Sequence, residues 1–113
     1  MMMRIACAAF VALASACASS AAAQTSADVV ISQVYGGGGN AGAPFRNDYI
    51  ELFNRTGAPA AIGGWTLQYA SSTGTRWQVV AIPAGTTLAP GARYLVALAS
   101  GGAIGAALPD PDL

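Results

Sequence analysis

The sequence predicts an all-β domain, built as an antiparallel sandwich or barrel, and three observations support this. Behind the N-terminal segment, short runs rich in Val, Ile and aromatic residues alternate between apolar and polar positions. Gly- and Pro-containing turns separate these runs every few residues. In the same part of the chain, no stretch of a dozen residues has apolar side chains at helical spacing. A parallel βαβ arrangement is therefore excluded, because it needs a crossover helix.

The N-terminal residues 1–23 have the order of parts of a secretory signal peptide. Arg4 supplies a short basic region, and an apolar run of signal-peptide length extends from Ile5 to Ala14. The sequence Ala21-Ala22-Ala23 then fits an Ala-x-Ala site, with cleavage before Gln24. We therefore expect a signal peptide over 1–23 and a domain over 24–113 that is secreted or periplasmic.

Two alternatives to plain secretion stay open for this segment. A retained transmembrane anchor is disfavoured because the apolar run is short and is followed by three serines. A lipoprotein anchored at Cys17 is the other alternative, although bacterial lipoprotein signals usually carry Leu where Ala14 stands. After cleavage at Ala23, we expect no attachment to a membrane.

Five strands are predicted in the rest of the chain. Asp28 to Tyr35 is rich in Val and Ile, and Asp48 to Asn54 places two aliphatic residues on one face. Trp65 to Ala70 alternates cleanly, and Trp77 to Ile82 and Tyr94 to Ala99 are short apolar runs between turns. The side chains predicted to face inward are Val30, Val34, Ile50, Leu52, Trp65, Leu67, Val79, Leu88, Leu95 and Val96.

Composition narrows the classes of function. The five basic and five acidic residues give a net charge of zero, and the basic residues form no cluster. Binding to nucleic acid or to an anionic membrane needs a concentrated positive field, so neither is expected. The chain has no His and no Lys, and both cysteines lie within residues 1–23. These absences exclude catalysis by a Ser-His-Asp triad, by a Schiff base or by a thiol. We therefore expect a protein without catalytic residues or cofactors.

The glycines at 37, 39 and 42 match the G-x-G-x-x-G spacing of dinucleotide-binding loops. A dinucleotide site also needs a helix directly behind the last glycine, and here the chain runs into another predicted strand. We therefore interpret this segment as a strand connection in which the glycines occupy positive-φ positions.

Oxygen-bearing side chains follow the glycines and could form part of a calcium site: Asn40, Asn47, Asp48 and Glu51. The alternative is that Asn47 and Asp48 shape the turn into the strand while Glu51 lies on its solvated face. An acid–base pair of Asp48 and Glu51 is disfavoured, because residues three apart point to opposite sides of a strand. We expect no metal site, with Asp48 and Glu51 as weak candidates.

Aromatic residues could also form a binding surface. Trp65 and Trp77 could stack on a carbohydrate, but aromatic residues in alternating strands are more often core, and we predict both in the core. Tyr35, Tyr49 and Phe53 are better candidates for an exposed aromatic surface, although scattered surface aromatics are common.

Four segments in order resemble the lamin tail domain of bacterial secreted proteins. They are Val29–Tyr35 followed by the glycine loop, Asn47–Asn54, Gly63–Tyr69 with its Gly-Gly-Trp entry, and Leu88–Val96 with its Leu-x-Pro-Gly turn. The resemblance implies an immunoglobulin-like sandwich that serves as a non-catalytic adhesion or accessory module, with an unidentified protein or surface ligand as partner. It also implies an alternative: the chain is the N-terminal fragment of a secreted nuclease or phosphatase of the endonuclease/exonuclease/phosphatase type.

Members of that family continue into further strands beyond the Pro-Asp segment at residues 109–112. The resemblance therefore implies that the sandwich is incomplete and that the chain is a fragment, or a broken gene product without function. In that case Tyr94 to Ala99, which is apolar and uncharged, would be an exposed edge strand through which copies could associate.

Overall fold

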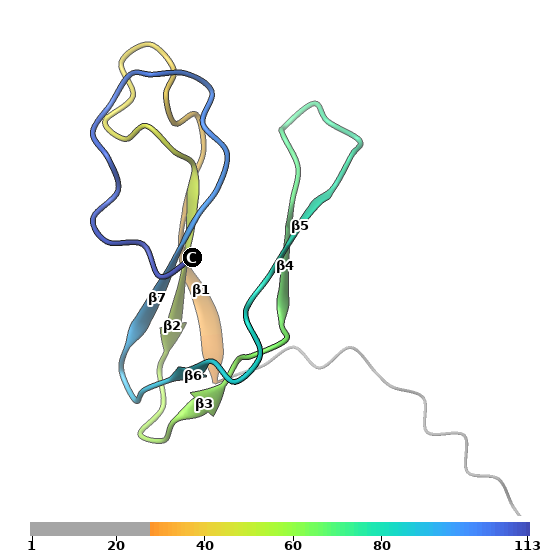
Figure 1. Cartoon of the computed structure of the whole chain (residues 1–113), viewed down its shortest axis with the longest axis vertical. Helices are drawn as coiled ribbons and strands as arrows, with labels where there is room; N and C mark the ends of the chain where they lie inside the picture. Colours follow the sequence, from red (N-terminus) through yellow and green to blue (C-terminus); the bar gives the residue numbers. More distant parts are fainter. Residues whose placement is uncertain (1–27) are drawn as a thin grey trace, which may run out of the picture.

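The computed structural model describes residues 28–113, and their secondary structure consists of strands without a helix (Figure 1). The strands are β1 (Val29–Tyr35), β2 (Tyr49–Asn54), β3 (Ala60–Ala61), β4 (Thr66–Tyr69), β5 (Gln78–Ala81), β6 (Thr87–Leu88) and β7 (Arg93–Ala97). The predicted all-β class is confirmed, and the five predicted strands are present with slightly shifted ends. The predicted signal peptide and its cleavage point lie outside the described residues. Within 28–113, no helix is long and apolar enough to cross a membrane.

The first layer is a three-stranded antiparallel sheet in the order β1-β2-β7. Strand β2 lies in the middle, with Ile50 paired to Val34 of β1 on one side and to Val96 of β7 on the other. Because side chains alternate across a strand, Ile50, Leu52 and Asn54 all point to one face of this sheet. All three are buried, so this face lies against the core.

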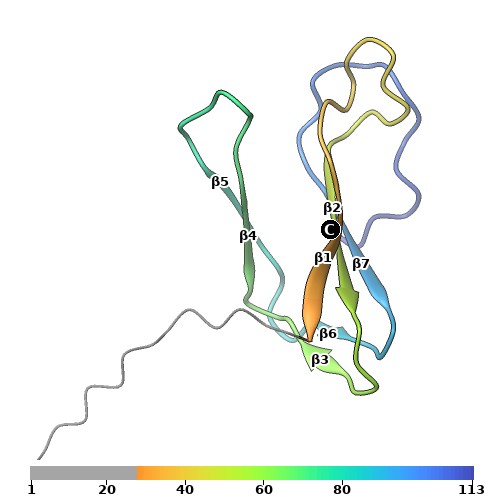
Figure 2. The ribbon, with the colours of Figure 1, turned by 180° about the vertical axis from the view of Figure 1, so that it is seen from behind.

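The second layer is a two-stranded ribbon that runs from β3 into β4 and returns through β5 into β6. β3 pairs with β6 and β4 pairs with β5. Hydrogen bonds between the two pairs make the ribbon continuous: Gly64 N–H donates to Ile82 O, and Ile82 N–H donates to Trp65 O. In both views the β4–β5 hairpin rises beside the first sheet, and the layers join through β3 and β6 (Figures 1 and 2).

The core lies between these layers and contains eight buried apolar side chains: Val29, Ile50, Leu52, Ile62, Ile82, Leu88, Tyr94 and Val96. Four of the predicted inward residues belong to it, and Leu67 packs against it from β4. The prediction was wrong for Val30, Val34, Trp65, Val79 and Leu95. Leu95 is adjacent to Val96 in β7, so alternation places it on the opposite face of the sheet.

A bulge explains the errors in β1. The register with β2 shifts between Ile31 and Gln33, so that Ser32 is the extra residue. A bulge reverses the alternation that follows it, so Val30 and Val34 point to opposite faces although they are four residues apart. Val34 shares a face with core residue Ile50, yet β1 is an edge strand and the Val34 side chain is 71% exposed.

Both tryptophans were predicted in the core, and both predictions are wrong. Trp65 is 37% exposed because it follows the bend at Gly63-Gly64, where Gly64 has a φ of 81°. Ile62, before that bend, occupies the buried position instead. Trp77 is 66% exposed. It directly precedes Gln78, whose partner Tyr69 packs against the core, so alternation turns Trp77 outward.

Strand β7 is not the exposed apolar edge that the sequence predicted. Its Tyr94 and Val96 side chains are buried in the core. Its outer edge is covered by the C-terminal residues, because Asp112 N–H donates to Leu95 O over 2.8 Å and Ala97 N–H donates to Leu113 O over 2.7 Å. These bonds satisfy backbone groups that an open edge would leave unpaired.

Candidate functional site

The outer face of the β1-β2-β7 sheet, opposite the core, carries the candidate site. Alternation along β2 turns Tyr49, Glu51 and Phe53 to this face, and along β7 it does the same for Leu95. These side chains are half-buried, although no second layer formed by residues 28–113 covers them. They are instead covered by one another and by the loops that flank the sheet.

Three aromatic rings form one cluster on this face. Tyr35 of β1 and Tyr49 of β2 are cross-strand partners, and their rings stack at a centroid distance of 5.3 Å. Phe45, from the loop between the two strands, meets both rings edge-on at 5.8 and 5.9 Å. Stacked and edge-to-face pairs at these distances are each worth about 0.5–1.5 kcal/mol beyond the buried area. These contacts favour one arrangement of the three rings on this face.

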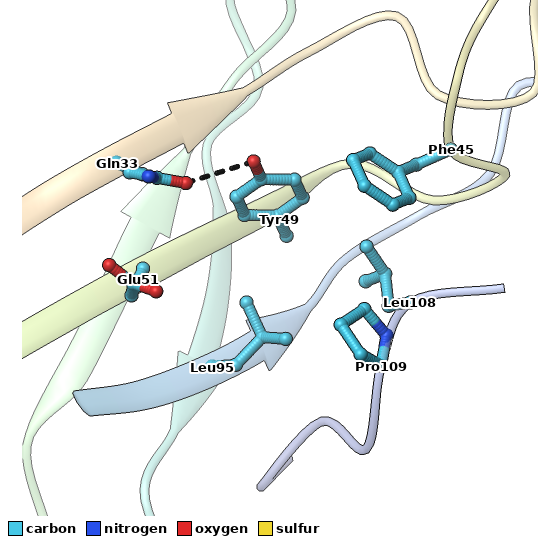
Figure 3. Close-up of a pocket in the computed structure, with 7 residues that line it drawn as sticks. All are labelled: Gln33, Phe45, Tyr49, Glu51, Leu95, Leu108 and Pro109. Carbon is cyan, nitrogen blue, oxygen red and sulfur yellow. Dashed lines mark hydrogen bonds between the residues drawn. The ribbon is translucent and has the colours of Figure 1, made fainter. Parts of the chain in front are cut away.

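A small pocket of about 170 Å³ opens beside this cluster (Figure 3). We call it the outer-face pocket; its lining residues are Gln33, Phe45, Tyr49, Glu51, Leu95, Leu108 and Pro109. Tyr49 Oη donates a hydrogen bond of 3.0 Å to Gln33 Oε1, which holds the ring against β1. Leu108 and Pro109 reach the pocket from the C-terminal segment that also covers the edge of β7. The pocket is thus mainly apolar, with an amide and a carboxylate on one side.

The carboxylate of Glu51 is held by two partners. Ser32 Oγ, in the bulge of β1, donates to Glu51 Oε1 over 2.6 Å, and Arg93 Nη1 lies 2.7 Å from the same oxygen. The Arg93 guanidinium also lies over the Phe53 ring, 4.7 Å from its centroid, which is a cation–π arrangement. The Ser32 hydrogen bond is the main cause that lowers the pKa of Glu51; burial opposes it, and the bond and charge of Arg93 add to it.

This arrangement predicts a pH-dependent contribution of Glu51 to stability. A carboxyl whose pKa is lower in the folded state stabilises the fold above its ordinary pKa, and loses this effect as the pH falls through the folded value. We expect Glu51→Gln to lower the free energy of unfolding at neutral pH by about 1 kcal/mol, as for a partly exposed ion pair. Urea titrations of both proteins should converge at strongly acidic pH. A difference that stays constant down to low pH would contradict this role of the charge.

The two weak metal candidates are not brought together. Asp48 Oδ1 accepts a hydrogen bond of 2.6 Å from Gly38 N–H, on the side of the glycine loop, whereas Glu51 lies on the outer face. Asn47 Nδ2 donates to Leu98 O over 2.9 Å, so Asn47 and Asp48 both fasten the turn into β2. Within residues 28–113, no three His, Cys, Asp or Glu side chains converge as metal ligands.

The glycine loop has the conformation that the sequence predicted. Gly37, Gly39 and Gly42 have φ values of 86°, 80° and 78°, which confirms their use at positive-φ positions. The chain runs on from this loop through Phe45 into β2, with no helix to hold a pyrophosphate.

Sequence reasoning missed part of the site. Tyr35 and Tyr49 were proposed as surface aromatics, but Phe45, Gln33 and Leu108 were not considered. Phe45 and Leu108 lie in irregular segments, where no periodicity shows which way a side chain points. The contact between Tyr35 and Tyr49 could have been predicted, because the two strands that carry them are adjacent in the sequence and pair with each other.

The chain matches a known protein family. A family model described as Lamin Tail Domain matches residues 22–109. No curated protein and no solved structure matches the chain. The family match covers most of the sequence and includes all seven strands, and it is to a domain that is not catalytic.

Proposed function

The chain belongs to the lamin tail domain family, and from this premise we propose that it is a non-catalytic binding module of an exported protein, acting through the outer-face pocket. The observation that carries the proposal is an apolar pocket, walled by the aromatic cluster, on the solvent side of a sheet. Such a face suits both an adhesion role and an accessory role beside a catalytic domain. Export rests on the signal-peptide pattern of residues 1–23.

The size and charge of the pocket indicate what it holds. At about 170 Å³ it is smaller than the roughly 300–1,000 Å³ of typical small-molecule sites, so it suits a single side chain. The carboxylate of Glu51 is already paired with Arg93, so a charged ligand would gain little binding free energy from it. Leu95, Leu108 and Pro109 favour an aliphatic or aromatic group. We therefore propose that a protein partner inserts one apolar side chain, which is how interfaces commonly anchor.

Selection of short peptides displayed on phage against the purified chain tests this proposal. We expect the enriched peptides to share one apolar anchor residue. Leu95→Glu, which places a charge in the pocket, should weaken their binding at least about tenfold, equivalent to 1.4 kcal/mol. Val79→Glu is the matched control, because Val79 is an exposed apolar residue on β5, outside the pocket. Peptides that bind both variants equally well would place the binding surface elsewhere.

A further inference from the structure

A second, larger pocket lies on the other side of β2, between the glycine loop and the tip of the β4–β5 hairpin. Its volume is about 500 Å³, within the range of small-molecule sites. The residues that line it are Gly36, Gly37, Gly38, Asn40, Asp48, Ala70, Ser71, Ser72 and Gly101. It shares no residue with the outer-face pocket. We call it the loop pocket.

The side of the loop pocket formed by the glycine loop is preorganised. Gly38 N–H donates to Asp48 Oδ1 over 2.6 Å, and Gly101 N–H donates to Gly38 O over 2.8 Å. Gly38 is buried, and a Cβ at this position would lie 2.3 Å from the carbonyl carbon of Asn47. Three segments are therefore packed backbone to backbone here. Because the loop is already ordered, a ligand that binds this side loses little free energy in ordering it, which favours binding.

The hairpin tip forms the facing side. Ser71 and Ser72 lie in the connection between β4 and β5, directly after Ala70. Gly74 N–H donates to Ser71 O over 2.9 Å, which closes a turn at the tip. The pocket thus brings Ser71 and Ser72 of the hairpin opposite Asp48 and Asn40 of the other side.

The side chains of this lining discriminate between classes of ligand. Its one charged side chain is Asp48, which disfavours phosphate and carboxylate ligands because no Arg of the lining offsets the negative charge. Calcium takes six to eight oxygens, and usually more than one carboxylate. The lining also has no aromatic or large aliphatic side chain to bury an apolar ligand.

A neutral polyhydroxylated ligand meets these constraints. Each sugar hydroxyl both donates and accepts, so it can donate to the Asp48 carboxylate while accepting from the Asn40 amide or from a serine hydroxyl. Gly38 N–H and Gly101 N–H are already bonded within the protein, but the carbonyl oxygens of Gly37 and Gly38 each keep a second lone pair that can accept from a hydroxyl. We propose that the loop pocket binds a neutral saccharide, a mono- or disaccharide unit, independently of the protein partner of the outer-face pocket.

Nuclear magnetic resonance of the ¹⁵N-labelled chain tests this inference. Glucose, galactose, N-acetylglucosamine and their disaccharides are titrated, with inorganic phosphate and calcium chloride in parallel. We expect at least one saccharide to shift the amide signals of Gly37, Gly38, Ser72 and Gly101 with a Kd on the order of 1–10 mM. Phosphate and calcium should leave these signals in place.

Two matched variants separate binding from general effects of charge. Asp48→Asn keeps an oxygen for the Gly38 N–H but removes the charge, and it should raise the Kd about fivefold or more through the weaker acceptor. Asp110→Asn makes the same change outside the pocket and should leave the Kd unchanged. The inference is overturned if no saccharide shifts the loop-pocket amides. It is equally overturned if only phosphate or calcium does so, or if saccharides shift Gln33 and Leu95 instead.

Discussion

Replacing Asn54 with Asp is expected to lower the free energy of unfolding by about 3–5 kcal/mol, the range for an uncompensated buried charge. Asn54 is 0% exposed. Its Nδ2 donates to Ala58 O over 2.8 Å and to Leu88 O over 3.0 Å. It also lies within bonding distance of Ala89 O, and its Oδ1 accepts from Thr56. One amide thus ties the end of β2 to β6 and to the loop before β3.

The aspartate is almost the same shape, so its effect would be electrostatic. A carboxylate would face two or three carbonyl oxygens with no proton between them, and those carbonyls would lose their donor. The variant should therefore recover part of its stability as the pH falls and the carboxyl protonates, because a protonated carboxyl regains one donor.

Urea denaturation at several pH values measures both effects. Asn40→Asp is the matched control: Asn40 is exposed, so the same change there should stay within about 0.5 kcal/mol. Equal unfolding midpoints for the two variants at neutral pH would show that the hydrogen bonds of Asn54 do not stabilise the fold in this way.

The second large effect is expected for Gly39→Ala. Gly39 has a φ of 80°, and a Cβ there would lie 2.4 Å from the backbone N and O of Gly102. The left-handed backbone costs an Ala about 1–2 kcal/mol. The backbone clash adds about 1–3 kcal/mol, because Gly102 cannot move as the end of a flexible side chain could. We expect a total loss of about 2–5 kcal/mol.

Gly42→Ala separates the cost of the left-handed backbone from the cost of the clash. Gly42 has nearly the same φ, 78°, but a Cβ there would meet no atom within 4 Å. This control should lose only the backbone term of about 1–2 kcal/mol. Thermal unfolding of both variants gives the comparison. If the two proteins melt at the same temperature, the close approach of the glycine loop to Gly102 does not contribute to stability.

The two faces of β2 could be predicted from alternation alone. Ile50 and Leu52 were placed correctly because a regular strand has a fixed period of two. The same rule failed in β1, where one extra residue at Ser32 reverses the faces and leaves no sign in the apolar pattern. Alternation describes regular strands, and it carries no information about where a strand is interrupted.

The remaining misses lie where regular structure ends. Ile62 and Ile82 are fully or almost fully buried, yet they stand at the ribbon's bends, outside the regular strands. The burial of Asn54 could not be predicted, because a polar residue at a strand end gives no hint of burial. The outer-face pocket depends on Leu108, whose partners are distant in sequence. These features come from tertiary contacts, which a local pattern does not contain.

The pairing of β2 with β7 affects when the domain can fold during synthesis. Leu52 pairs with Tyr94, so the central strand finds its second neighbour only after some forty intervening residues have left the ribosome. Until then β1 and β2 form at most a two-stranded hairpin, which is marginal in water. Such non-local pairing slows folding, because a long loop must close before its contacts can form. This delay would suit the export that we propose, because the chain would still be extended when it reached an export channel.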